Sequence, residues 1–318
     1  MRVGTLSHSD LLLQHMLRQQ NDMVRSQEQV ATGKKYNDLQ GFGSQSSHLV
    51  STKSLLNQIE GHQKANHALL GRLDAFNTGL TELERIGGEF RDAIHKARGN
   101  NNGTGLQAEV SSMLQRAVSV LNTRFEGRFL FGGANTDQAP VTVGNEAEIL
   151  AIAEPPAGEF FTDSGSAPTV RLDERATLTA GVAASEVAGD LLHAMQRVLM
   201  FDSGTLPAGA GAFAPAGSLD GQLSQNESDY LADELNRVLS AVDTLQTAAT
   251  ENGLNMKAVD AVQTRLGEQE ISLTEIVAGV ENVDLAEVAA KLNRQQVTLE
   301  ASFRMIAEMR SLNLFNAL

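Results

Sequence analysis

The sequence has no cysteine and no tryptophan, and only 4% of its 318 residues are aromatic. Without cysteine, the chain cannot form disulfides, thiolate metal sites or a cysteine nucleophile. So few aromatic side chains fit slim packing between helices better than one thick globular core. No apolar run approaches the roughly 18 residues of a membrane-spanning helix. The first residues also lack the continuous apolar segment of a secretory signal peptide, so we expect no cleaved signal.

Basic residues are scarce as well, and the net charge is −14. This argues against nucleic acid as a partner, because phosphate binding needs a basic face. The charge is also uneven. Residues 1–45 sum to +1 and residues 281–318 to −1, so the whole excess lies between them. Near-neutral ends can crowd against copies of themselves, while an acidic middle keeps the outer surface soluble.

Proline is missing from both flanks, since all six prolines lie between Pro140 and Pro215. Proline breaks helix interiors, so this distribution predicts helical flanks around a non-helical centre. Within the flanks, apolar residues recur at alternating spacings of four and three over residues 55–94 and 231–280. That heptad spacing predicts two long amphipathic helices.

The two ends carry weaker apolar heptads that predict one helix each. An isolated amphipathic helix is marginal in water, so we expect the two to pair with each other or with neighbouring subunits. Gln20, Gln27 and Gln295 interrupt these seams, either as ordinary irregularity or as buried amides that specify register. The predicted assembly contacts are Leu6, Leu13, Met16, Met23, Val30, Leu285, Val288, Leu292, Leu299, Ile306 and Met309.

The centre, residues 140–222, alternates short apolar runs with turn residues and predicts short strands, one of them at 168–172. Residues 185–201 predict a helix capped by Ser185. The expected fold is therefore mainly α, with an inserted domain that is α+β or β-rich. Three domains are expected: a terminal coiled coil of 1–45 with 281–318, a long helical bundle of 46–139 with 223–280, and an outer domain of 140–222.

The residues that carry chemistry form no recognisable site. The seven histidines include no HExxH pattern, and His62 with Asn66 on an apolar seam favours a polar pair that sets register. Carboxylates are dispersed, as on solvated helix faces, and no GxSxG is present. We therefore predict no metal, no cofactor and no catalytic residues, although an enzymatic role of the central domain stays open as an alternative.

The stretch RFEGRFLFGGANTDQAP, residues 124–140, combines three phenylalanines with a glycine pair where the helical pattern stops. It is either a ligand loop or a joint between two kinds of domain. It lacks the GK[ST] end of a phosphate loop and follows a helix rather than a strand, which favours the joint. The predicted joint residues are Phe125, which closes the helical seam, and Phe129, Phe131, Gly132 and Gly133.

Three segments resemble the flagellin superfamily of bacterial flagella, in particular its members at the hook–filament junction. They are QEQVATGKKYNDLQGFGS at 27–44, FEGRFLFGGANTDQAP at 125–140, and the last helical segment at 284–318. Together the resemblance covers roughly residues 1–140 and 225–318, and the central domain shows no family pattern. Flagellin itself is the alternative, but the ending SLNLFNAL and the FLFGG motif are closer to the junction members.

The resemblance implies an extracellular structural subunit, exported through the flagellar type III channel without a cleaved signal. It implies that the two terminal helices pair within the inner layer of a tubular polymer or ring, while the inserted domain faces outward. The implied partners are copies of the chain itself, another hook-associated protein on the hook side, flagellin on the filament side and an export chaperone in the cytosol. Neither nucleic acid nor membrane is implied.

Overall fold

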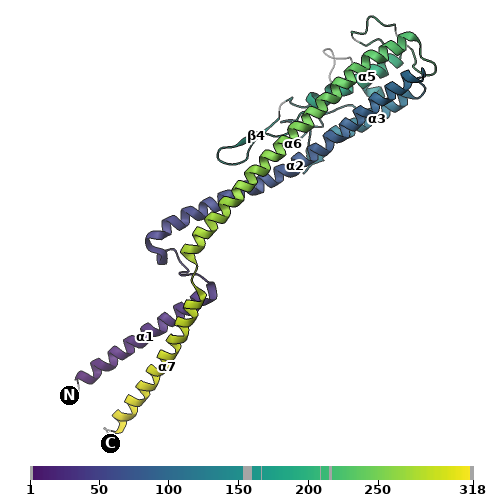
Figure 1. The fold of residues 1–318 in the computed structure, drawn as a ribbon. Helices are drawn as coiled ribbons and strands as arrows, with labels where there is room; N and C mark the ends of the chain where they lie inside the picture. Colours follow the sequence, from purple (N-terminus) through teal and green to yellow (C-terminus); the bar gives the residue numbers. More distant parts are fainter. Residues whose placement is uncertain (1–2, 153–159, 166, 208, 215–216, 316–318) are drawn as a thin grey trace. The chain divides into compact units, whose positions relative to one another are not determined.

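The computed structural model describes residues 3–152, 160–165, 167–207, 209–214 and 217–315. Within the terminal helices, the side chains of residues 3–10, 12 and 309–315 lie outside this description. The chain divides into two compact units, unit 1 of residues 1–60 with 267–318 and unit 2 of residues 61–266. Figure 1 labels their main elements. The three-domain division expected from the sequence stays a prediction.

Unit 1 is built on two terminal helices, α1 (Val3–Thr32) and α7 (Leu285–Phe315). They lie side by side and run antiparallel, as Figure 1 shows. The short 3-10 helix η1 (Gln40–Gln45) follows α1. The beginning of α2 (Ser46–Gly99) and the end of α6 (Gln225–Glu281) complete the unit. The expected pairing of the two terminal helices is therefore present within one molecule.

The turn after α1 is tied to the end of α6 by backbone and side-chain bonds. Lys35 N donates to Glu281 O at 2.7 Å, and Lys35 Nζ donates to Gly279 O at 2.9 Å. The Glu281 carboxylate is largely buried and pairs with both Lys34 and Lys53. This cluster fixes where the chain leaves α1 and where it enters α7, because the two turns share it.

Unit 2 has its core between α2, α3 (Leu106–Leu121), α5 (Ala184–Asp202) and α6. The predicted seams of α2 and α6 point into this core, with Leu80, Phe90, Val238 and Leu245 fully buried. Buried amides join the long helices to their surroundings. Asn252 Nδ2 donates to Leu73 O at 2.8 Å. The sequence prediction of long helices with heptad seams is confirmed.

The inserted part of unit 2 is mixed, as expected, but holds less β-structure than predicted. Among the described residues its one sheet is the antiparallel pair β3 (Thr169–Arg171) and β4 (Thr177–Thr179). The short helix α4 (Glu146–Leu150) replaces a predicted strand, because the Asn145 side chain caps it by accepting from Glu148 N. The only other pairing in this part of the described chain is single bridges such as Val141 with Phe161.

Two polar residues expected to act locally instead make long-range bonds. Asn66, fully buried on α2, donates from Nδ2 to Leu172 O at 3.1 Å and so joins α2 to the end of β3, rather than pairing with His62. Ser185 does not cap α5. Its N and Oγ both donate to the Asp163 carboxylate at 2.7 Å, so the cap comes from a loop about 20 residues earlier. No described helix is long and apolar enough to cross a membrane.

Candidate assembly interface

The helix pair of unit 1 buries only one narrow seam of predicted contact residues. Val288 is buried, and Met16, Met23, Leu292, Leu299 and Ile306 are half-buried. Leu13, Val30 and Leu285 are exposed, at 58%, 39% and 53%. The side chains of Leu6 and Met309 lie outside the described residues. The predicted contacts therefore divide into a set that joins α1 to α7 and a set that faces outward.

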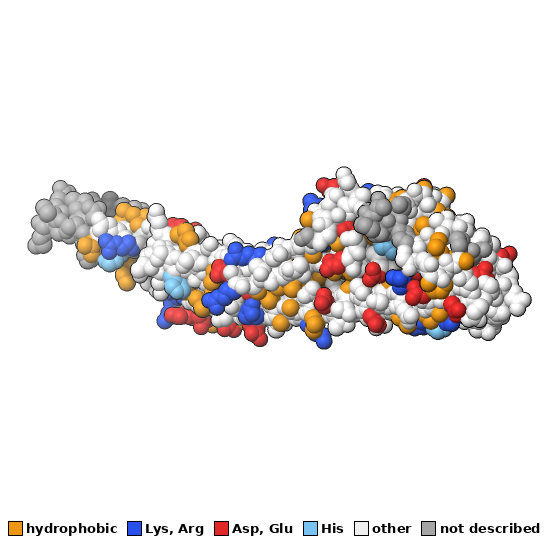
Figure 2. All heavy atoms as spheres, turned by 90° about the horizontal axis from the view of Figure 1, so that it is seen from above, with side chains coloured by type: hydrophobic (Ala, Val, Ile, Leu, Met, Phe, Trp, Pro, Cys, Tyr) orange, Lys and Arg blue, Asp and Glu red, His pale blue; other side chains and the backbone are white. Residues whose placement is uncertain are grey.

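Exposed hydrophobic side chains are concentrated in unit 1. Among the side chains that the structure describes, 17 large hydrophobic ones are exposed; 15 of these lie in unit 1, and Leu239 and Leu254 lie in unit 2. On α1 they include Leu13, Leu17 and Val24, which share one side of the helix. Figure 2 shows hydrophobic side chains (orange) at the surface between charged ones on the face in view. A concentration of this kind marks a surface built to be covered.

The inner polar positions of α1 differ from the predicted ones by one residue. Gln20 and Gln27 are exposed, and the positions that face α7 are Gln19 and Ser26, the latter only 1% exposed. Ser302 Oγ donates to Gln19 Oε1 over 3.5 Å across the pair. Because both helices place polar residues in this seam, the seam is only weakly apolar. The more apolar side of α1 faces away from α7.

The joint predicted at residues 124–140 contains a β-hairpin that the sequence did not indicate. Strand β1 (Arg124–Phe125) pairs with β2 (Arg128–Phe129) across a two-residue turn. Both turn residues, Glu126 and Gly127, have positive φ, at 50° and 81°. That is the geometry of the turn that best matches the twist of a hairpin. α3 ends at Leu121, so Phe125 lies in a strand and does not close a helical seam.

The segment that ends the hairpin and continues after it is buried on both sides. Phe129, Leu130 and Phe131 are all buried, so side chains on both sides of this segment are covered. Phe131 meets the Phe76 ring of α2 edge to face, with the ring centroids 5.2 Å apart. Its carbonyl also accepts from Ala184 N at the start of α5. The stretch thereby holds the hairpin, α2 and α5 together.

The glycine pair after Phe131 is required for two different reasons. Gly133 has φ of 62°, which favours glycine. At Gly132 a Cβ atom would lie 2.2 Å from Asn135 O, closer than real Cβ atoms approach backbone. The turn therefore tolerates no side chain at either position.

We expect Gly132→Ala to lower the free energy of unfolding by about 1–3 kcal/mol, because the backbone of the turn must shift to relieve the overlap. Urea unfolding followed by circular dichroism measures this. Gly88→Ala is the control, since no heavy atom lies within 4 Å of the added Cβ. It should raise stability by about 0.5–1 kcal/mol through helix propensity. Wild-type stability of Gly132→Ala would show that the turn is not constrained.

A buried ion pair lies between α5 and α6. Arg197 Nε donates to Glu234 Oε1 at 2.8 Å, and Glu234 is fully buried. Tyr230, which stacks on Phe201 with centroids 3.7 Å apart, donates from its hydroxyl to Arg197 O. Burial raises the pKa of Glu234, and the Arg197 guanidinium opposes that rise. Sequence periodicity places Leu231 and Leu235 in the core but gives no signal for this charged pair.

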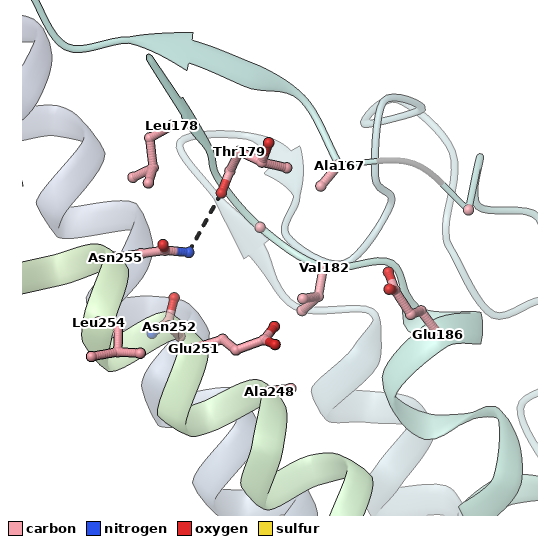
Figure 3. A pocket seen from close by; sticks show the side chains of 12 residues that line it. Ala167, Leu178, Thr179, Val182, Glu186, Ala248, Glu251, Asn252, Leu254 and Asn255 are labelled. Atoms are coloured by element: carbon pink, nitrogen blue, oxygen red, sulfur yellow. Dashed lines mark hydrogen bonds between the residues drawn. The ribbon is translucent and has the colours of Figure 1, made fainter. Parts of the chain in front are cut away.

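A pocket of 640 Å³ lies between β4, the start of α5 and α6, and Figure 3 shows the side chains that line it. Glu186 and Glu251 bring two carboxylates to it, and Asn255 Nδ2 donates to Thr179 O at 3.4 Å across it. Its described lining contains no histidine, serine, lysine or arginine. The described residues also include no cluster of metal-ligating side chains.

Comparison with known proteins shows what the chain is similar to. Residues 3–136 match the model of the bacterial flagellin N-terminal helical region. A flagellar hook-associated protein from Vibrio parahaemolyticus is 18% identical with a TM-score of 0.58, and the match covers 74% of this chain and 97% of that one. FlgL from Bacillus cereus is 15% identical with a TM-score of 0.52, covering 72% and 98%. No curated protein sequence matches the chain.

The matched region, residues 3–136, contains α1, the loop after it, α2, α3 and the hairpin. Of the three segments that carry the resemblance in the sequence, 27–44 lies wholly inside it and 125–140 lies inside it up to residue 136. The two structures share the fold across nearly their whole length. Residues 3–136 therefore match the bacterial flagellin N-terminal helical region, and the chain shares its fold with flagellar hook-associated proteins.

Proposed function

We propose that this chain is a structural adaptor subunit of the bacterial flagellum, which polymerises at the hook–filament junction through its terminal helices. The observation that carries the proposal is the concentration of exposed hydrophobic side chains in unit 1, on a fold shared with hook-associated proteins. In a lone molecule these side chains face water. Contact of apolar side chains with water is unfavourable, and burying them against neighbouring copies contributes roughly 25 cal/mol of stabilisation for each Å² covered.

The proposed partners follow from this role. Copies of the chain pack beside each other through α1 and α7. Another hook-associated protein contacts the assembly on the hook side and flagellin contacts it on the filament side. A chaperone covers the terminal helices before export through the flagellar type III pathway. We propose that the chain, whose fold is that of hook-associated proteins, is a structural component and not an enzyme.

Flagellin is the second candidate, because the family model that matches residues 3–136 is that of flagellin. The two functions differ in what the purified protein forms. A flagellin assembles into long filaments alone, whereas an adaptor forms short rings or no polymer. The fold shared with two hook-associated proteins favours the adaptor.

The position of the protein in a flagellum tests the proposal. Gold-labelled antibodies against residues 160–214 should mark one thin band at the end of the hook in electron micrographs. The same antibodies on cells that lack the gene provide the control. Label along the whole filament would establish flagellin instead, and flagella without label would refute both functions.

A further inference from the structure

The β1–β2 hairpin and α2 enclose a cleft of 440 Å³ that neither the core nor the terminal helices use. We call it the arginine cleft. Its walls come from α2, the hairpin and β3. It is lined by Ala65, Ala68, Leu69, Arg72, Phe125, Glu126, Arg128, Phe129, Leu130 and Val170. Its lining combines apolar side chains, Leu69 and the two phenylalanines among them, with the charged side chains of Arg72, Arg128 and Glu126.

Arg72 and Arg128, which line this cleft, and the neighbouring Arg124 form no ion pair within the described part of the chain, although Glu126 also lines the cleft. Arg72, Arg124 and Arg128 make no ion pair or side-chain hydrogen bond to any described residue. Instead, Arg124 stacks over the Phe129 ring at 4.2 Å, and Arg72 lies 5.6 Å from the Phe76 centroid. Burial and the nearby charge of Arg128 both lower the pKa of Arg72. Crowded cations left unpaired in a chain of net charge −14 indicate that an anionic group comes from outside.

The chain carries a complementary surface on α6. Glu268, Ile271 and Glu275 are spaced three and four apart, so they share one helix face, which we call the acidic face. All three side chains are exposed, and Ile271 is the most exposed large hydrophobic residue described, at 63%. No lysine or arginine occurs from residue 266 to 290. Neither Glu268 nor Glu275 forms an ion pair with another described residue.

We infer that the arginine cleft of one molecule receives the acidic face of a second copy of the chain. Ile271 would lie against the apolar side chains of the cleft, and the two carboxylates would accept from Arg72 and Arg128, whose planar guanidinium groups suit carboxylates. The two surfaces differ, so the contact is head-to-tail, and its repetition builds a ring or a tube rather than a closed dimer. The inference rests on the proposed function, and it adds a second contact to that of the terminal helices.

Cysteine cross-linking tests the contact directly, because the natural chain has no cysteine. Glu126→Cys places a thiol at the cleft, and Ser272→Cys places one beside Ile271, while both arginines and both glutamates remain. The two full-length variants are co-expressed in cells that lack the natural gene, and isolated flagella are oxidised. A cross-linked dimer should form only when both variants are present. Asp243→Cys, an exposed position on α6 within unit 2, replaces Ser272→Cys as the control and should give none.

Charge reversal then tests which groups hold the contact. Adding Arg128→Glu to the Glu126→Cys variant should reduce the dimer about tenfold, through like-charge repulsion. Adding Glu275→Arg to the other variant should restore it. Because Arg128 is exposed, its replacement should leave the unfolding midpoint of the monomer unchanged.

The outcomes separate this inference from the proposed function. If the Glu126→Cys and Ser272→Cys variants are found in flagella but do not cross-link to each other, the inference is wrong and the adaptor function stands. A dimer that persists unchanged with Arg128→Glu, or a thiol at residue 126 that captures a different flagellar protein, also overturns it. If the wild-type chain is absent from flagella, both fail.

Discussion

Leu13→Asp should abolish incorporation of the chain into flagella while leaving the monomer folded. Leu13 is 58% exposed on α1, so a carboxylate there meets only water in the monomer. In an assembly that covers this side of α1, the substitution removes about 1.5–3 kcal/mol of apolar burial. It also buries an unpaired charge, which costs several kcal/mol more. The combined loss corresponds to more than about a thousandfold weaker association at every contact.

The measurement is immunoblotting of isolated flagella and of the culture medium, together with the thermal midpoint of the purified variant. The variant should be exported into the medium, absent from flagella, and as stable as the wild type. Leu254→Asp is the matched control, because Leu254 is 60% exposed but lies in unit 2. It should incorporate normally. Normal flagella from Leu13→Asp, or an equal defect from Leu254→Asp, would show that unit 1 is not the principal assembly surface.

Arg197→Met should lower the free energy of unfolding by about 3–5 kcal/mol at neutral pH, because it leaves the buried Glu234 carboxylate without its main partner. Methionine keeps much of the side-chain volume, so the loss reports charge rather than a cavity. Urea unfolding measures it. Arg237→Met removes a second, 49% exposed arginine whose Nε lies 3.5 Å from the same carboxylate, and it should cost less than about 1 kcal/mol.

The cost of Arg197→Met should also depend on pH, in a direction set by Glu234. Its pKa is already raised by burial in the folded protein, and removing Arg197 raises it further. A carboxyl with a raised pKa binds its proton more tightly in the folded state than in the unfolded state. The cost is therefore largest at pH values above the folded pKa, and it shrinks as the pH falls toward the unfolded value of about 4.3.

Measuring the free energy of unfolding of the wild type and of Arg197→Met at about pH 8 and about pH 5 isolates the contribution of Glu234, because the other carboxyl groups are common to both proteins. The double variant Arg197→Met with Glu234→Leu should recover most of the stability at both pH values, as an apolar pair replaces an ionic one. A cost that stays constant across this pH range would mean that Glu234 is not what the substitution exposes.

The helical part of this fold could be predicted because its signals are local and repeated. Proline confined to 140–215 and heptads in α2 and α6 are each visible in the sequence alone. The parts that were missed depend on contacts between distant residues. Asp163 caps α5 from outside the helix, and Asn66 bonds a carbonyl at residue 172. The hairpin turn uses Glu126-Gly127 rather than the usual Asn-Gly, so its signal is weak.

The candidate interface could be predicted only in outline. The apolar heptads placed the contacts on α1 and α7, but they did not separate the residues that join the two helices from those that face outward. Because 3.6 residues per turn does not match a seven-residue repeat, the inner side drifts, and Gln19 and Ser26 occupy positions assigned to Gln20 and Gln27. The sequence contains no signal for the arginine cleft, because Arg72 and Arg128 are 56 positions apart and line the same cleft only in the folded unit.

The antiparallel pairing of α1 with α7 has a consequence for the order of folding. Gln19 and Ser302, which meet across the pair, are separated by 283 residues in the sequence. Such a contact has a high sequence separation, and closing so long a loop is entropically unfavourable and slow. A chain that emerges from its first residue onward therefore carries α1 without its partner until almost everything else has emerged. The helix pair therefore forms only in a chain that has been made through α7, and a chain that ends anywhere before α7 cannot form it.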